Sequence, residues 1–200
     1  MQRFVLRQNL TRFRNLLAQE TNETRQKTLR SLICVAQRQL ASLDSAESGV
    51  LSPGSASAGV SRDYRRINEF EREFQNSSHP YLVLDPRPGL HIVDINDAYA
   101  RATMTNRAGV SGEPMFHVFP DNPDDYFADG VNNLYASLSI AATSGRPHAM
   151  MVQRYDIRDP NGKFVERYWR PVNTPLCDEN GRLIFLLHHV EDVTSDVVST

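Results

Sequence analysis

The sequence predicts an α+β protein, with a five-stranded antiparallel sheet carrying helices on one face and an N-terminal helical hairpin ahead of it. Two short apolar runs precede several helical segments, and three longer apolar-rich runs follow them. The first 43 residues show two further helical stripes. With 40% hydrophobic and 23% charged residues, the 200-residue chain suits one domain of moderate size plus an appendage.

Residues 1–43 are predicted to form two amphipathic helices joined by a turn at Thr21 and Asn22, which can cap a following helix. Apolar side chains recur on one face of each helix at spacings of three and four. A hairpin alone buries such stripes poorly, so the pattern favours self-association into a four-helix bundle. The stripes are Leu6, Leu10, Phe13 and Leu17, then Leu29, Leu32, Ile33, Ala36, Leu40 and Leu43.

This hairpin is basic, with eight Arg or Lys residues against Glu20 and Glu23, while the remainder of the chain has a net charge of −8. The charge fits solvated helix faces, a nucleic-acid patch or a transit peptide. We favour solvated faces, because no aromatic or Gly-rich nucleic-acid signature accompanies the arginines. The continued helical pattern and the two glutamates argue against a transit peptide.

Residues 44–61, "DSAESGVLSPGSASAGVS", are predicted to be a flexible linker, since their composition buries little apolar surface. Residues 62–194 form the globular part, and residues 195–200 a tail. No apolar run approaches the ~20 residues that span a bilayer. Cys34 and Cys177 are far apart and form no CxxC pair, which favours a reducing, cytoplasmic setting.

The globular part begins with an amphipathic helix carrying Tyr64, Ile67, Phe70 and Phe74. "YLVLD" (81–85) and "LHIVDIN" (90–96) are predicted strands, separated by "PRPG". A helix follows, with Asn96 or Asp97 as its N-cap.

Residues 111–120 form a short helical piece that stops at Pro120. Residues 131–145 form a longer helix with Val131, Leu134, Leu138 and Ala141/Ala142 on one face and Gly145 at its C-terminal end. Strands are then expected near 148–158, 164–177 and 183–194. "DPNGK" and "DENGR" separate them, and each contains Asn-Gly, which tolerates the positive φ angles of tight hairpins.

Several of these segments together resemble a PAS domain. "YLVLD…LHIVDINDAY" is similar to the first PAS hairpin and the Asn-Asp-Ala that begins its first helix, and "GEPMFHVFP" to the segment that follows. "SGRP" resembles the exit from the long connecting helix, and "ENGRLIFLLHHVEDVT" the closing hairpin with its typical Asp-Val-Thr end. The resemblance covers about two-thirds of the chain and rests on the order and spacing of these motifs.

The resemblance implies a sensory or interaction module that binds a small molecule between sheet and helices, or only dimerises. The change would pass to an effector through the end of the last strand. In bacteria that effector is most often a histidine kinase, a cyclic-dinucleotide enzyme or a transcription factor. We therefore expect a cytoplasmic, bacterial-type sensory protein in a two-component-type pathway, either stand-alone or the sensor part of a longer kinase.

Specialised members of the family bind particular cofactors, and the sequence does not support two of these modes. The flavin (LOV) type needs a cysteine after the first helix, where "MTNRAGVSGEPMFHVFP" has none. The haem type uses a histidine on the long helix, and "VNNLYASLSIAATSG" has none. His117 could ligate a haem in another geometry, but we favour its interpretation as a polar residue of a short helix. The cofactor is therefore unknown.

Enzyme activity is not expected from the motifs. No phosphate-binding GxxxxGK[ST] or GxGxxG occurs, and "HHVED" belongs to a strand and lacks the proline of a kinase phospho-acceptor motif. The alternative from another class is a small cone-shaped isomerase or hydratase, in which His188 and Asp156 would act as an acid–base pair.

Strand periodicity sends His188 and His189 to opposite faces, so the pair cannot easily grip one metal ion. The resemblance turns His188 and Val190 toward a ligand cavity, where a change of His188 charge near pH 6.5 would tune binding. Such a cavity could hold an aromatic or carboxylate ligand, or be filled by its own side chains. The candidate lining is Trp169, Asn173, His188, Val190, Tyr155, Met115, Phe116 and Leu134. Met104 is expected beside Met115, Phe116 and Leu134 on the wall that faces the sheet.

The opposite sheet face is predicted to be partly apolar, which usually marks an interface. The Phe70/Phe74 helix or a second copy of the chain would cover it, so we expect a homodimer. A ligand-free protein–protein adaptor remains an alternative function. The residues on this face are Tyr168, Arg170, Val172, Phe185 and Leu187, with His189 and Glu191 beside them.

Overall fold

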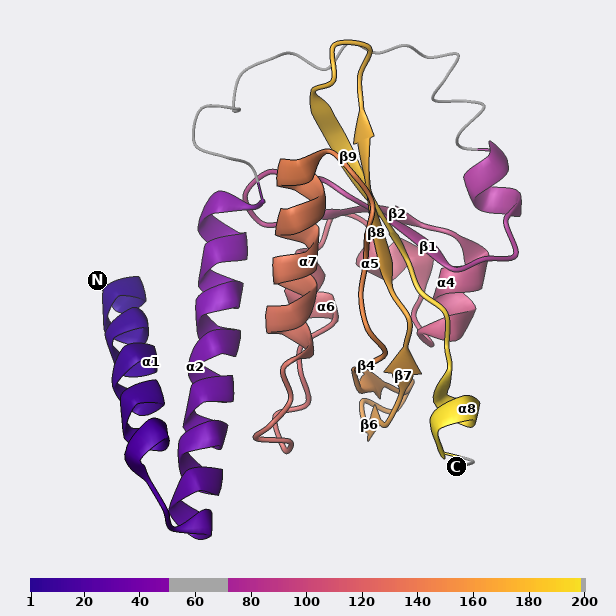
Figure 1. Cartoon of the computed structure of the whole chain (residues 1–200). Helices are drawn as coiled ribbons and strands as arrows, with labels where there is room; N and C mark the ends of the chain where they lie inside the picture. The colour runs from indigo at the N-terminus through magenta and orange to yellow at the C-terminus, as the bar shows by residue number, and fades with distance from the viewer. Residues whose placement is uncertain (51–71, 199–200) are drawn as a thin grey trace.

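A five-stranded antiparallel sheet forms the centre of the chain in a computed structural model that describes residues 1–50 and 72–198 (Figure 1). The strand order is β2-β1-β9-β8-β3, and the predicted five-stranded antiparallel sheet is confirmed. The strands are β1 (Tyr81–Leu84), β2 (Ile92–Ile95), β3 (His148–Ala149), β8 (Val172–Cys177) and β9 (Leu183–His189). Tyr64, Ile67 and Phe70 of the predicted leading helix lie outside the described residues, as do residues 51–61 of the predicted linker.

The predicted strands 148–158 and 164–177 are each broken into short pieces. Besides β3 and β8 they contain β4 (Gln153–Arg154) paired with β7 (Tyr168–Trp169), and β5 (Ile157–Arg158) paired with β6 (Phe164–Val165). Pro171 stands between β7 and β8 and has no amide hydrogen to donate to a neighbouring strand. The ladder therefore divides there, and the small ribbons extend beyond the lower end of the sheet (Figure 1).

Both predicted Asn-Gly hairpins form, but only the glycines adopt positive φ, 82° at Gly162 and 74° at Gly181. In each turn the leading aspartate fixes the backbone. Asp159 Oδ1 accepts the amide hydrogens of Asn161 and Lys163, both at 2.9 Å. Asp178 does the same in the second turn. The aspartate cap and a glycine bulge thus replace the two-residue positive-φ turn that the Asn-Gly pair suggested.

The predicted helices of the globular part bury their apolar residues in the main core. Asn96 caps α4 (Asp97–Ala102) by accepting the amide hydrogen of Tyr99 at 2.9 Å, and its own amide donates to the carbonyls of Phe74 and His79. Two short helices, α5 (Arg107–Val110) and α6 (Met115–Val118), follow. The long helix α7 (Gly130–Ser144) buries Val131, Leu134, Leu138 and Ala141 and ends at left-handed Gly145, as predicted.

The N-terminal hairpin consists of α1 (Gln2–Gln19) and α2 (Glu23–Ser48), with Asn22 capping α2. Helix α2 continues five residues into the predicted linker, so residues 44–48 are helical rather than flexible. Two contacts explain the extension: Asp44 pairs with Arg3 of α1 at 2.6 Å, and the Ser45 carbonyl accepts the amide hydrogen of Gly89 at 2.8 Å.

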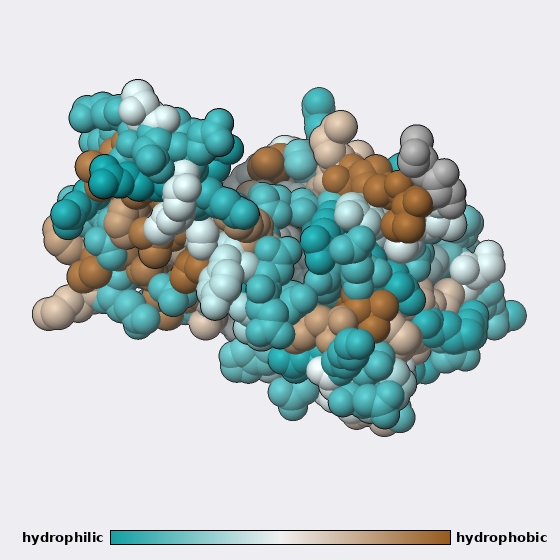
Figure 2. Space-filling view, turned by 90° about the horizontal axis from the view of Figure 1, so that it is seen from below, coloured by the Kyte–Doolittle hydropathy of each residue, from teal (hydrophilic) through white to brown (hydrophobic). Residues whose placement is uncertain are grey.

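Helix α2 runs beside α7, on the side of that helix away from the sheet (Figure 1). Ala41 and Val50 join the main hydrophobic core, while Leu6, Leu10 and Ala36 form a separate small cluster between α1 and α2. The α2 stripe is thus partly buried within one chain. Viewed from below, the hairpin is a lobe on which apolar surface still shows (Figure 2). Its exposed large apolar residues are Met1, Phe4, Val5, Leu16 and Leu32.

Among the described helices, none is both long and apolar enough to cross a membrane.

Candidate functional site

A small cavity of about 40 Å³ lies between the sheet and the helices. It has room for about three water molecules. Six of the eight residues predicted to line it do so: Trp169, His188, Val190, Tyr155, Met115 and Leu134. The rest of the described lining was not predicted from the sequence and consists of Tyr99, Thr103, Phe119, Met150, Gln153, Ile157 and Pro171.

Asn173 and Phe116 are buried but are not among the residues that line the cavity. Asn173 lies directly opposite His188 in the β8–β9 pairing and holds that histidine instead. Phe116 lies on α6 and packs edge-on against Tyr135 of α7, with ring centroids 6.5 Å apart. Met104 packs against the core and adopts a positive φ of 54° without lining the cavity. Strand alternation predicts a face correctly but not which inward residue borders the empty space.

A chain of hydrogen bonds holds the sheet wall of the cavity. His188 Nδ1 lies 2.7 Å from Asn173 Oδ1, and Asn173 Nδ2 donates to Ser137 Oγ of α7 at 2.7 Å. Ser137 Oγ in turn lies 2.7 Å from His148 Nδ1 on β3. Ser137 was detectable in the sequence as a polar residue on the same helix face as Leu134, Leu138 and Ala141.

Burial lowers the pKa of His188 to about 3, with a smaller contribution from the neighbouring His189. The predicted change of charge near pH 6.5 is therefore wrong, because an imidazolium at this position would lose its hydration without gaining an anionic partner. His188 is neutral at physiological pH. His189 lies on the other face, as predicted, where its ring packs against Tyr81 and His79.

Aromatic residues from the strands form the opposite end of the cavity. The Trp169 indole donates to the Tyr155 carbonyl at 2.8 Å, and the Tyr155 hydroxyl donates to the Phe119 carbonyl. The Tyr155 ring lies against Gly130 at the start of α7, where an added Cβ would fall 2.2 Å from a ring carbon. Only glycine permits this approach, so Gly130 sets the position of the tyrosine.

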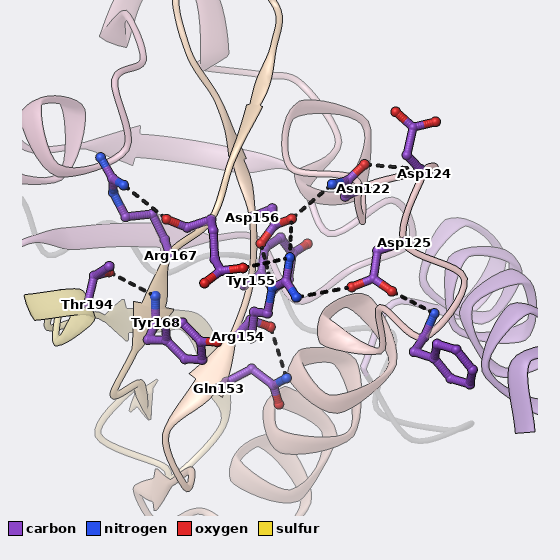
Figure 3. Close-up of polar contacts among 12 residues, drawn as sticks. Asn122, Asp124, Asp125, Gln153, Arg154, Tyr155, Asp156, Arg167, Tyr168 and Thr194 are labelled. Carbon is purple, nitrogen blue, oxygen red and sulfur yellow. Dashed lines mark hydrogen bonds and ion pairs between the residues drawn. The ribbon is translucent and has the colours of Figure 1, made fainter. Parts of the chain in front are cut away.

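A polar network lies behind this wall, on the side of the loop that leads into α7 (Figure 3). Arg154 pairs with Asp156 and with Glu166, both at 3.0 Å, and reaches Asp125 of the loop at 3.6 Å. Asn122 donates to Asp156 at 2.9 Å. Asp156 therefore bonds to Arg154 and Asn122, whereas His188 bonds to Asn173. The structure does not bring His188 and Asp156 together as the acid–base pair that the alternative enzyme would need.

The same loop receives the N-terminal hairpin. Asp121 caps α7 by accepting the amide hydrogen of Val131 at 3.0 Å, and its other oxygen lies 3.0 Å from Arg38 Nε of α2. Arg38 also donates to the carbonyls of Asp125 and Ala128. Burial is the largest influence on Asp121 and raises the pKa of its carboxyl, although Arg38 and the Val131 amide act in the opposite direction.

Metal ligation has no visible basis in residues 1–50 and 72–198, where no three His, Cys, Asp or Glu side chains are grouped for an ion. The two cysteines do not line the cavity: Cys34 lies on α2, and Cys177 is exposed at the end of β8.

These features define a class of α+β domain in which a small, partly open cavity lies between an antiparallel sheet and a long connecting helix. The family model described as "PAS fold" matches residues 74–198, more than half of the chain. This protein belongs to the PAS family, and the resemblance seen in the sequence is confirmed. No curated protein matches the chain.

Solved structures of light-oxygen-voltage proteins are similar in fold. The Rhodobacter sphaeroides LOV protein is 16% identical with a TM-score of 0.53, over 68% of this chain and 72% of that one. An RNA-binding light-oxygen-voltage receptor is 18% identical with a TM-score of 0.50, over 72% of this chain. The match spans only 38% of that receptor's length. At these identities the likeness shows the fold alone.

Proposed function

We propose that this chain is a sensory PAS module that binds a small molecule in the cavity beside His188 and Trp169. The supporting observation is that protein groups alone orient the cavity wall, because Asn173 bonds His188 and Ser137 bonds Asn173. A preorganised polar group in a mainly apolar cavity is the usual arrangement of a small-molecule site.

The end of β9 is well placed to pass a change onward. The backbone of Asp192 forms an isolated antiparallel β-bridge with that of Trp169, which lines the cavity. The Val193 amide donates to the Tyr168 carbonyl at 2.9 Å. Thr194 accepts the amide hydrogen of Tyr168 and begins α8 (Thr194–Val198) (Figure 3). A displaced Trp169 would therefore move the segment that carries Asp-Val-Thr. We propose this segment as the output, toward a histidine kinase or another regulator in a bacterial, cytoplasmic pathway.

A homodimer is part of the same proposal. The outer sheet face carries Val172, Phe185 and Leu187, all of which are half-buried in the single chain. A second copy placed there would cover them, as the hairpin's exposed apolar residues would be covered in a larger bundle.

The second candidate function is a ligand-free adaptor, favoured by the small size of the cavity, which is far below the ~300 Å³ usual for drug-sized ligands. The cone-shaped enzyme has less support, because His188 is bonded to Asn173, and Asp156 to Arg154.

Native mass spectrometry of the purified chain tests the proposal, since it reports subunit number and bound mass together. We expect a dimer carrying a small ligand, and loss of that ligand in Leu134→Trp, which fills the cavity. Ile140→Trp is the matched control, because Ile140 is an exposed residue of the same helix. A chain that never carries bound mass, and whose thermal stability no small-molecule extract changes, would favour the adaptor.

A further inference from the structure

The hydrogen-bond chain beside the cavity crosses four elements, from β9 through β8 and α7 to β3. It links His188, Asn173, Ser137 and His148 by three contacts of 2.7 Å each. Asn173 is fully buried and Ser137 nearly so, so neither exchanges partners with solvent. The donor and acceptor groups of Asn173 and Ser137 are therefore set by their protein neighbours.

The orientation of the Asn173 amide determines which His188 nitrogen carries the proton. Asn173 Nδ2 lies 3.8 Å from the Met150 sulfur, and a thioether can only accept a hydrogen bond. The NH₂ group therefore faces Met150 and Ser137, and the carbonyl oxygen faces His188. Since that oxygen can only accept, His188 Nδ1 is the donor. In a neutral imidazole Nε2 then keeps an unshared electron pair.

Most other polar groups of the described lining are already bonded within the protein. The Trp169 indole, the Tyr155 hydroxyl and the Gln153 amide each have protein partners. The Thr103 hydroxyl donates to the Tyr99 carbonyl. Among the described residues, His188 Nε2 and the Tyr99 hydroxyl are the lining groups left without a hydrogen bond, and their rings lie 6.1 Å apart in an edge-on arrangement.

Charge is the second restriction on the ligand. No Arg, Lys, Asp or Glu occurs among the described residues that line the cavity. A carboxylate entering it would lose its hydration and find no cation in contact. Of the aromatic and carboxylate ligands that the sequence left open, the lining therefore favours the uncharged aromatic class.

We propose that the cavity selects a small uncharged ring compound that donates a hydrogen bond, through O–H or N–H, to His188 Nε2. This inference rests on the proposed ligand-binding function and adds the ligand's chemical class. Asn173 and Ser137 act as positioning residues, because they fix the histidine's tautomer without bordering the cavity. The cavity of about 40 Å³ is below the ~150 Å³ that encloses a benzene ring, so a single ring is the upper limit and would extend through the open side of the cavity.

Three single-ring probes of similar shape test the selection: phenol donates, anisole only accepts, and benzoate is an anion. Trp169 is the only tryptophan and lines the cavity, so its emission reports binding directly. We expect phenol to bind about tenfold more tightly than anisole, the difference made by one buried hydrogen bond. Benzoate should bind more weakly than both.

The outcomes separate the inference from the function on which it rests. If anisole or benzoate equals phenol, the cavity binds ligands but the proposed selection is wrong. If none of the three changes Trp169 emission, and native mass spectrometry also finds no bound mass, the binding function and the inference fail together.

The tautomer can be measured without any ligand. Nitrogen-15 NMR of the imidazole side chains should place His188 Nδ1 in the protonated range and Nε2 in the unprotonated range. A protonated Nε2 would overturn the inference, since the cavity would then offer a donor and select acceptors.

Ser137→Ala removes the second link of the chain without touching the cavity. We expect it to lower phenol affinity several-fold and leave anisole affinity unchanged, because only the donor ligand uses the fixed nitrogen. Ser139→Ala is the matched control on α7, where Ser139 donates to the Tyr135 carbonyl of its own helix. Equal losses for phenol and anisole would indicate a merely structural role and contradict the assignment.

Discussion

On its sheet side, helix α7 buries Ser137 in a hydrogen-bond chain that leads to the neutral His188, whereas at its N-terminus it is capped by the buried carboxylate of Asp121, which pairs with Arg38. The first network joins elements of the PAS core. The second joins that core to the N-terminal hairpin. Because uncharged and charged groups respond differently to acid and to loss of a partner, the core and the hairpin contact should respond differently to the same treatments.

The difference matters for the proposed sensor. The buried His188, with its pKa of about 3, stays neutral across physiological pH, which suits a group that must recognise a ligand. The ion pair instead leaves a buried charge whenever one partner departs. Docking of α2 against the loop before α7 is therefore more sensitive to single substitutions than the burial of Ala41 in the main core would suggest.

The largest effect is expected for Arg38→Leu, which leaves the Asp121 carboxylate buried without its cation. The free energy of unfolding should fall by about 3 kcal/mol. Chemical denaturation would measure this loss, and hydrogen exchange should rise first in α2. Arg30→Leu is the control, since Arg30 is exposed on the same helix. Equal losses in the two variants would mean that the Arg38 contacts do not hold the hairpin.

The sheet side can be tested by pH, because His188 has a pKa of about 3 in the folded chain and 6.5 as its ordinary value. Between these values the unfolded chain binds the extra proton, so stability is complete above pH 6.5 and decreases as the pH falls. From pH 6.5 to 5 the loss should be about 2 kcal/mol. His189 contributes in the same direction, since burial and His79 lower its pKa as well.

His188→Gln removes this titration while keeping a side-chain donor within reach of Asn173, so the acid loss should become much smaller. His117→Gln changes an exposed histidine of α6 and serves as the control. A wild-type acid loss that persists undiminished in His188→Gln would show that His188 is not its source.

The sequence predicted those parts of the molecule that depend on local patterns. The α7 stripe, the Asn96 cap, the two hairpins and the opposite faces of His188 and His189 follow from periodicity and turn chemistry over a few residues. The contacts that define the site join distant positions, such as Arg38 with Asp121 and Ser137 with Asn173. Periodicity gives a residue's face but not its partner, which is why Asn173 was assigned to the cavity lining and the length of α2 was underestimated.

The smallest effect is expected for Asp121→Asn, which keeps an acceptor for the Val131 amide and removes the charge. Arg38 would retain the carbonyls of Asp125 and Ala128 as partners, so the cost at neutral pH should be about 1 kcal/mol. Because burial raises the Asp121 pKa above 3.8, its ionisation costs the folded chain stability as the pH rises through the folded pKa. This slope is opposite to that of His188 and should vanish in the variant. Asp124→Asn, at an exposed position of the same loop, should leave it in place. If both variants keep the slope, Asp121 is not its source, and the contrast between the two sides of α7 loses its electrostatic basis.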